Sequence, residues 1–128
     1  MPSPWKILIV DDDPTVHKLI TKRLSADSFQ IHSVMNPISA IEEVSKVKPD
    51  LVILDLMMPK VSGIEVCQKI KQNPSTRNTL VLILSAKESQ EDRILGLEIG
   101  ADDYISKPFH LASLVRKIEY MLAQKMVP

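Results

Sequence analysis

The sequence lacks several features that would point to particular classes of protein. Its 128 residues include a single cysteine, Cys67, so no disulfide framework can form and a reducing compartment is expected. Three glycines leave little material for a glycine-rich nucleotide loop. The longest apolar runs, 7–10 and 80–84, are too short to span a bilayer, and the first residues do not form a signal peptide. These absences predict a cytoplasmic protein that does not bind membranes.

An excess of charge of either sign is also missing. Sixteen Lys and Arg balance sixteen Asp and Glu, which argues against direct nucleic-acid binding, because neutralising phosphates requires a basic excess. The 45% of hydrophobic residues is ordinary for a globular protein, and a chain of this length has no room for a second domain.

Short apolar runs alternate with segments of helical period. The runs at 7–10, 51–54 and 80–84 are apolar on both faces, which is typical of strands in a parallel sheet covered by helices on both sides. Weaker strands are expected at 30–34 and 103–106. The pattern predicts five repeats of strand then helix, the order of a doubly wound α/β domain.

The starts of the helices between these strands are also readable. Helix caps are expected at Asp13-Pro14, Asn36-Pro37, Ser62 with Glu65, and Ser89 with Asp92. The last helix begins near Leu111 and should end near Gln124.

Polar side chains follow four of the predicted strands. They are Asp11, Asp12 and Asp13 after the first strand, Asp55 after the third, Ser85 after the fourth and Lys107 after the fifth. In doubly wound sheets the functional crevice lies beyond the carboxyl ends of the strands, so these side chains should meet there.

Their chemistry suits a phosphoryl group held on or beside an aspartate. Clustered carboxylates repel one another, and Mg²⁺, which prefers oxygen ligands, would relieve that repulsion. Lys107 and Ser85 could contact phosphoryl oxygens, and a carboxylate can act as the nucleophile that forms an aspartyl phosphate. Asp55 interrupts an apolar run where a charge is costly unless it is paired or functional, whereas Asp13 is expected to be a helix cap.

With these motifs in hand, the chain resembles the receiver domain of two-component response regulators. The matching motifs are ILIVDDDP, LVILDLMMP followed by Ser62-Gly63, LILSAK and GADDYISKPF, in that order. The resemblance runs from Lys6 to about Leu122 and implies a single receiver domain over residues 1–128 with its core at about 6–122. It also implies a flavodoxin-like (CheY-like) five-stranded parallel sheet of order 2-1-3-4-5 with five helices.

The resemblance assigns roles to individual residues. Asp55 would be the phosphoacceptor and also a metal ligand, and Asp12 would ligate Mg²⁺ directly. Asp11 would bind the ion through water, and the Met57 backbone carbonyl would be a further ligand. Mn²⁺ could substitute for Mg²⁺.

Two more residues complete the implied phosphoryl site. Ser85 and Lys107 would each contact a phosphoryl oxygen, and Lys107-Pro108 would be a cis peptide. The phosphoryl group would come from the phosphohistidine of a sensor histidine kinase or a phosphotransfer protein. The domain would catalyse only its own phosphorylation and dephosphorylation, so it is not expected to be an enzyme in the usual sense.

Switching is implied to couple Ser85 to Tyr104 and to repack the face formed by the fourth helix, the fifth strand and the fifth helix. That face would control a partner or an attached output domain. It partly resembles the winged-helix transcription-regulator subgroup, in which this face makes a homodimer. The charges that match the ion-pairing positions are Arg93, Glu98, Asp103 and Lys117, whereas Ser113 stands where that subgroup usually has a glutamate.

Three alternatives are open. Residues 11–15 fit the D-x-D-x-T motif of haloacid-dehalogenase-type phosphatases, but the chain has no later acidic pair and no room for a cap domain. A flavodoxin-like nucleotide or flavin module would need a turn that approaches phosphate, and here that turn is rich in Asp. The third is a receiver scaffold that works without phosphorylation.

The histidines and the cysteine are not expected to bind metal. They lack metal-ligand spacing and are expected to be surface or core residues, namely His17, His32, His110 and Cys67.

Overall fold

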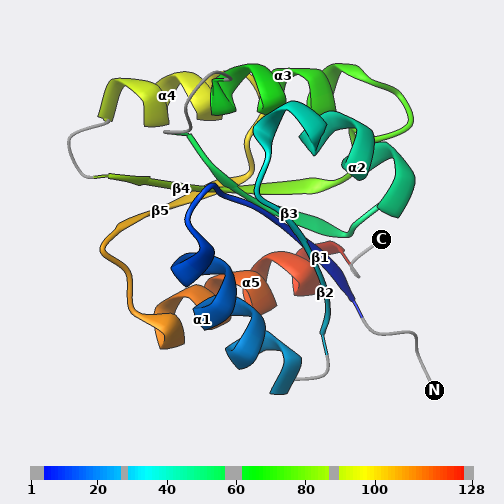
Figure 1. Ribbon diagram of the computed structural model, residues 1–128. Helices are drawn as coiled ribbons and strands as arrows, with labels where there is room; N and C mark the ends of the chain where they lie inside the picture. The colour runs from blue at the N-terminus through cyan, green and yellow to red at the C-terminus, as the bar shows by residue number, and fades with distance from the viewer. Residues whose placement is uncertain (1–4, 27–28, 57–61, 87–89, 126–128) are drawn as a thin grey trace.

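Five parallel strands alternate with five α-helices in the computed structural model, which describes residues 5–26, 29–56, 62–86 and 90–125 (Figure 1). The strands are β1 (Lys6–Val10), β2 (Gln30–Val34), β3 (Leu51–Asp55), β4 (Leu80–Ala86) and β5 (Asp103–Lys107). The α-helices are α1 (Pro14–Ala26), α2 (Ala40–Val47), α3 (Gly63–Gln72), α4 (Gln90–Glu98) and α5 (Leu111–Lys125), and a 3₁₀ helix, η1 (Pro37–Ser39), precedes α2.

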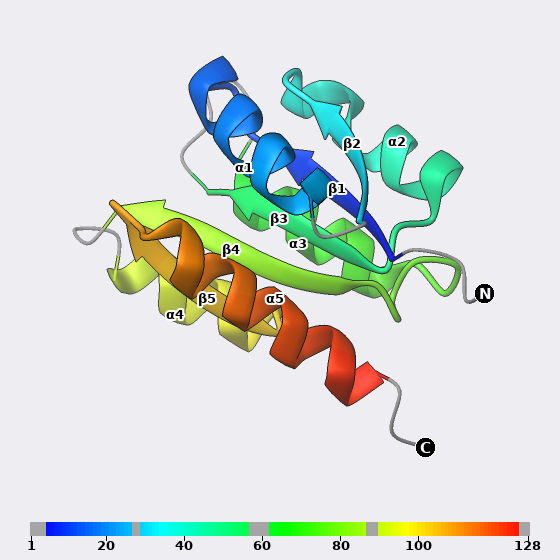
Figure 2. The ribbon, with the colours of Figure 1, turned by 90° about the horizontal axis from the view of Figure 1, so that it is seen from below.

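The strands form one sheet of order β2-β1-β3-β4-β5, in which every neighbouring pair is parallel. Helices α1 and α5 cover one face of the sheet, and α2, α3 and α4 cover the other (Figures 1 and 2). This confirms the predicted fold class and strand order. The order reverses beside β1, so the crevice expected of this fold lies at the carboxyl end of the sheet.

Alternate residues of the central strands pack into the two helical layers. One layer contains Ile7, Ile9, Leu51, Ile53, Leu82 and Leu84 from the strands, packed with Ile20 and Leu24 from α1 and with Leu114, Val115 and Ile118 from α5. The other contains Leu8, Val10, Val52, Leu54, Val81 and Ile83, packed with Ala40 and Val44 from α2 and with Val66, Cys67 and Ile70 from α3. Each fully buried Leu or Ile contributes roughly 1.5–3 kcal/mol, so the core holds the strand ends firmly in register.

Two of the predicted helix caps are present where the sequence placed them. Asp13 Oδ1 accepts a hydrogen bond from the Thr15 amide at 2.9 Å and caps α1. Ser62 Oγ accepts one from the Ile64 amide at 3.2 Å and caps α3. The cap predicted at Ser89 lies outside the described residues.

The helix predicted at Asn36-Pro37 begins differently. Asn36 accepts hydrogen bonds from the Ile38 and Ser39 amides, and the second of these, to its backbone carbonyl, makes the first turn 3₁₀. The α-helix therefore begins only at Ala40. Ile38 lies in this 3₁₀ turn and is 65% exposed.

Three strands reach further than their apolar runs. β3 includes Asp55, β4 includes Ser85 and Ala86, and β5 includes Lys107. These polar residues are thus held by the sheet itself and not by a loop. Within the described residues, no helix combines the length and hydropathy needed to cross a membrane.

Candidate functional site

Three carboxylates meet at the carboxyl end of the two central strands. Asp11 directly follows β1, and Asp55 is the last residue of β3. Both are buried, at 1% and 4% exposed, whereas the neighbouring Asp12 is exposed. One carboxylate oxygen from each of the three lies within 4.8 Å of the others, close enough for all three to serve one metal ion. The predicted acidic cluster is therefore present in the structure.

Lys107 reaches this cluster from the edge strand β5. It ends β5, and because β4 lies between β5 and β3, its side chain passes over the end of β4. Its Nζ is 3.2 Å from Asp11 Oδ2 and 3.3 Å from Asp55 Oδ2. The peptide between Lys107 and Pro108 is cis, as the resemblance implied.

The electrostatics of the site are those of an acidic cluster with too little positive charge. Burial raises the pKa of Asp11, and the nearby Asp55 raises it further, although the Asp13 amide and Lys107 oppose the shift. Burial acts to lower the pKa of Lys107, but the two carboxylates outweigh it and the net shift is upward. A divalent cation would relieve the repulsion that remains between Asp11 and Asp55.

The turn that carries Asp11 and Asp12 is fixed by several hydrogen bonds. The Asp11 amide donates to the Val34 carbonyl at 3.2 Å, and the Asp13 amide donates to Asp11 Oδ1 at 2.9 Å. His17 Nε2 lies 2.6 Å from the Asp11 carbonyl oxygen, and its side chain is buried. His17 was expected to be a surface or core residue with no role at the site. Its helical spacing to Ile20 and Leu24 indicated burial, but not its contact with Asp11.

The close packing of α3 against β3 depends on a glycine. A Cβ atom on Gly63, the first residue of α3, would lie 2.6 Å from the Asp55 carbonyl oxygen and 2.6 Å from Leu56 Cα. Both neighbours are backbone atoms, so the helix start could not tolerate a side chain without moving the strand end. Gly63 thus lets α3 pack directly behind Asp55.

Ser85 and Tyr104, the predicted switch pair, lie on adjacent strands. Ser85 is fully buried and its hydroxyl donates to the Ala86 carbonyl at 3.4 Å. Tyr104 pairs in register with Ile83, and its partly buried ring packs against the core layer of α2 and α3. Met57, the last implied metal ligand, lies outside the described residues.

The face formed by α4, β5 and α5 carries both charge and exposed apolar surface. Lys117 on α5 pairs with Asp103 on β5 at 3.3 Å within the chain, which occupies two of the four charges matched to the dimer face. Glu98 is exposed, and the side chain of Arg93 lies outside the described residues. The exposed apolar residues on this face are Ile94, Leu95, Leu97 and Tyr120.

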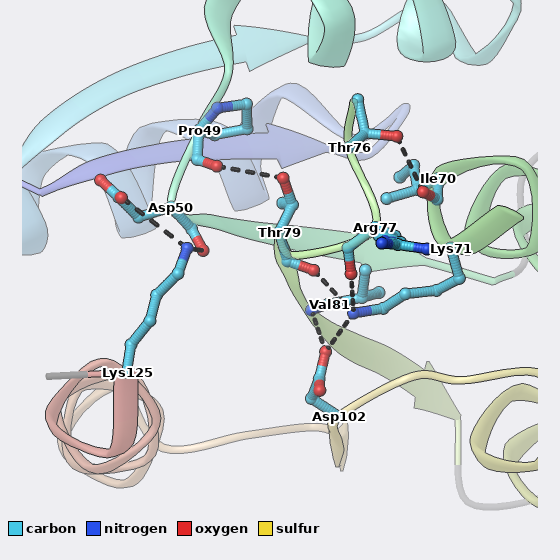
Figure 3. Close-up of polar contacts among 10 residues, drawn as sticks. All are labelled: Pro49, Asp50, Ile70, Lys71, Thr76, Arg77, Thr79, Val81, Asp102 and Lys125. Atoms are coloured by element: carbon cyan, nitrogen blue, oxygen red, sulfur yellow. Dashed lines mark hydrogen bonds and ion pairs between the residues drawn. The ribbon is translucent and has the colours of Figure 1, made fainter. Parts of the chain in front are cut away.

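A second lysine–carboxylate cluster lies at the opposite, amino end of the sheet (Figure 3). Lys71 Nζ on α3 donates to the Thr79 carbonyl at 2.7 Å, the Arg77 carbonyl at 3.3 Å and Asp102 Oδ2 at 2.8 Å. The same Asp102 oxygen accepts the Val81 amide at 2.8 Å. The cluster therefore ties the end of α3, the start of β4 and the turn before β5 together.

Further contacts surround this amino-end cluster. Thr79 Oγ1 donates to the Pro49 carbonyl at 3.2 Å, and Lys125, the last residue of α5, donates to the Asp50 carbonyl at 3.1 Å (Figure 3). Gly100 has a φ of +118°, and a Cβ there would lie 3.1 Å from Lys71 Cγ. The glycine therefore permits both the turn and the passage of the lysine stem.

Comparisons with known proteins point to one family. A profile described as the response regulator receiver domain matches residues 7–119. The chain is 39% identical over 118 residues to the sensory transduction protein BceR of Halalkalibacterium halodurans, covering 92% of this chain and 50% of BceR. The chain thus spans about half the length of the curated relatives it matches.

Two solved structures are also similar. A response regulator structure from Chloroflexus aurantiacus superposes with a TM-score of 0.87 at 32% identity, covering 94% of this chain and 98% of that one. The signal receiver domain of a histidine kinase from Syntrophus aciditrophicus superposes with a TM-score of 0.88 at 31% identity, covering 97% and 94% of the two chains.

Proposed function

The chain belongs to the response regulator receiver family, and from that premise we propose that it accepts a phosphoryl group on Asp55 from the phosphohistidine of a histidine kinase or phosphotransfer protein. The observation that carries this proposal is the placement of Asp55. It is a buried carboxylate at the end of a central strand, 3.3 Å from Lys107 and beside two further carboxylates.

In the proposed reaction a carboxylate oxygen of Asp55 attacks the phosphorus atom of the donor. The new O–P bond forms as the N–P bond to the histidine breaks, and the released imidazole nitrogen takes up a proton from solvent. Lys107 would stabilise negative charge on one phosphoryl oxygen, and the Ser85 hydroxyl would donate a hydrogen bond to another. The protein contributes positioning and charge neutralisation, which are the main components of phosphoryl-transfer catalysis.

The carboxylate cluster fits Mg²⁺, with Mn²⁺ as a substitute. Three carboxylate oxygens share one small region, and the raised pKa of Asp11 indicates that a further positive charge is favoured there. We propose that Asp12 and Asp55 bind the ion directly, that Asp11 binds it through water, and that the Met57 backbone carbonyl completes the protein ligands. Bound Mg²⁺ would neutralise charge on the phosphoryl group and on the acids around it.

For the output, we propose that phosphorylation couples Ser85 to Tyr104 and repacks the face formed by α4, β5 and α5. This face carries exposed Ile94, Leu95 and Leu97, which suits an interface with a second copy of the chain or with an attached output domain. The intrachain pair of Lys117 with Asp103 would have to rearrange for either residue to bind across a dimer.

We also propose the extent of the domain, its location and the limits of its catalysis. Residues 1–128 form a single receiver domain with its core at about 6–122. The domain acts in the cytoplasm, where its lone Cys67 stays reduced. Its only catalysis is its own phosphorylation and dephosphorylation.

The first test is the substitution Asp55→Asn. Wild type incubated with radiolabelled acetyl phosphate and Mg²⁺ should acquire one label that hydroxylamine removes, as expected of an acyl phosphate, and Asp55→Asn should acquire none. Asp50→Asn is the matched control, because Asp50 immediately precedes the same strand at its other end and should label normally.

The results distinguish the proposal from its alternatives. Label retained by Asp55→Asn would overturn the assignment. Label lost only on Asp11→Asn, together with turnover of a phosphate ester, would instead favour the haloacid-dehalogenase-type phosphatase. A wild type that takes no label from any phosphodonor would favour the phosphorylation-independent scaffold.

A further inference from the structure

His17 is a buried polar residue to which phosphoryl transfer assigns no role. It lies in the first part of α1, 6% exposed, and its Nε2 is 2.6 Å from the Asp11 carbonyl oxygen. A carbonyl oxygen can only accept a hydrogen bond, so Nε2 is the nitrogen that carries the hydrogen. The other ring nitrogen, Nδ1, is buried and has no hydrogen-bond partner among the described residues. Among the described residues, the hydrogen bond to Asp11 is therefore the one polar contact of the buried ring.

We infer that His17 is a positioning residue for the metal site, an inference that rests on the proposed function. The Asp11 carbonyl belongs to the peptide group that joins Asp11 to Asp12. By holding this carbonyl, His17 fixes the plane of the peptide from which both carboxylates project. The orientation of that plane sets where the Asp12 Cα lies, although His17 contacts neither carboxylate.

The surrounding hydrogen bonds show how the contact of His17 with the Asp11 carbonyl helps to position the turn of Asp11 and Asp12. The Asp11 amide is held by the Val34 carbonyl on β2, whereas Asp12 is exposed and follows the strand end. The His17 amide also donates to the Asp13 carbonyl at 3.3 Å, as part of the first turn of α1. His17 therefore holds the acidic turn at two points, through its ring at Asp11 and through its backbone at Asp13. Only the first of these depends on the side chain.

The side-chain contact can be removed and restored by substitution. His17→Leu removes the donor, and His17→Gln places an amide nitrogen close to the position of Nε2. The matched control is His32→Leu, because His32 on β2 is another histidine with a buried ring nitrogen. Its Nε2 has no partner among the described residues, and its strand neighbour is Leu8 and not an acid. The probe is Mn²⁺, with binding followed by the loss of the free-ion electron paramagnetic resonance signal.

We expect His17→Leu to weaken Mn²⁺ binding by about 10–100-fold, the usual effect of losing a residue that orients metal ligands. His17→Gln should recover most of this loss, and His32→Leu should bind as wild type does. Urea unfolding without metal is measured in parallel, because a residue that only packs would change stability and leave the Mn²⁺ dissociation constant alone.

The outcomes test the positioning role of His17 separately from the proposed metal site. A His17→Leu protein with reduced stability and a dissociation constant within twofold of wild type would overturn the positioning role, as would equal weakening in His17→Gln. If His17→Leu does not fold, His17→Asn replaces it, since its shorter amide does not reach the Nε2 position, and the same comparison with His17→Gln applies. A wild type that binds no Mn²⁺ would instead overturn the proposed metal site.

Discussion

Lysine contacts aspartate at both ends of the sheet, but the balance of charge differs between the two ends. At the amino end, the ammonium group of Lys71 has three hydrogens and three partners, namely two backbone carbonyls and Asp102. At the carboxyl end, Lys107 contacts two buried carboxylates, and the exposed Asp12 adds a third acid. Donors and acceptors match at the first end, whereas acids are in excess at the second. The lysine–aspartate contact is therefore balanced in charge at the amino end, whereas the carboxyl end keeps an excess of negative charge that suits the proposed metal and phosphoryl site.

The strongest challenge to this comparison is the substitution Lys107→Ala. If Lys107 stabilises charge on the transferring phosphoryl group, the rate of labelling by acetyl phosphate in saturating Mg²⁺ should fall by about 10²–10³-fold. The control is Lys117→Ala, which removes another lysine 3.3 Å from an aspartate but outside the acidic cluster, and it should label at the normal rate. A Lys107→Ala rate within threefold of wild type would remove Lys107 from the mechanism.

The converse substitution, Lys71→Met, should change stability and not chemistry. It keeps much of the apolar stem but leaves Asp102 and two carbonyls without their donor, so the free energy of unfolding should fall by about 1–3 kcal/mol. Urea unfolding followed by fluorescence of Trp5, the single tryptophan, measures this. Lys69→Met, an exposed position on the same helix, is the control and should stay within about 0.5 kcal/mol of wild type. A slower labelling rate in the folded Lys71→Met protein would contradict the division of roles.

The smallest expected effect is a gain in stability. Because the pKa of Asp11 is raised in the fold, its ionised form opposes folding once the pH exceeds that folded-state pKa. Without metal at neutral pH, Asp11→Asn should therefore stabilise the protein, by about 0.5–2 kcal/mol, the range usual for stabilising substitutions. The amide can still accept the Asp13 N–H.

The dependence on pH and metal checks the sign of this effect. The advantage of Asp11→Asn should shrink as the pH falls through the folded-state pKa of Asp11 and should vanish below the ordinary Asp value of 3.8. Added Mg²⁺ should also reduce it, since the metal favours ionised Asp11 in wild type. Urea titrations at several pH values, with and without Mg²⁺, give the differences. An Asp11→Asn protein less stable than wild type at neutral pH without metal would show that the acid excess does not destabilise the fold.

Much of the carboxyl end could be predicted from the sequence, because the parallel topology alone determines which residues meet there. Once the apolar runs are read as parallel strands, Asp11, Asp55 and Lys107 must emerge at one edge of the sheet, and the structure places them together. The chemical roles of these residues stay predictions. Three strands, β3, β4 and β5, extend one or two residues beyond their predicted ends, because a polar residue such as Asp55 interrupts an apolar pattern without interrupting the hydrogen-bonded ladder.

The amino end was not predictable in the same way. Two of the three partners of Lys71 are backbone carbonyls, which leave no mark in the amino-acid sequence, and Asp102 is 31 residues away. The same reason hid the contact of His17, which meets the backbone of Asp11 and not its side chain. Side chains that follow parallel strands can be brought together from the topology alone, whereas contacts to the main chain, such as those of Lys71 and His17, cannot.

The contact of Lys125 with Asp50 lies at the end of α5 that is farther from Lys107. The helix has 15 residues and is therefore about 22 Å long. Its last residue contacts Asp50, just before β3, whereas its first turn follows Lys107 and the proposed phosphoryl site. A shift of β5 at its Lys107 end would therefore act on the end of α5 opposite to this contact. A displacement at the carboxyl end of the sheet would then move the first turns of α5 most and the last turn least.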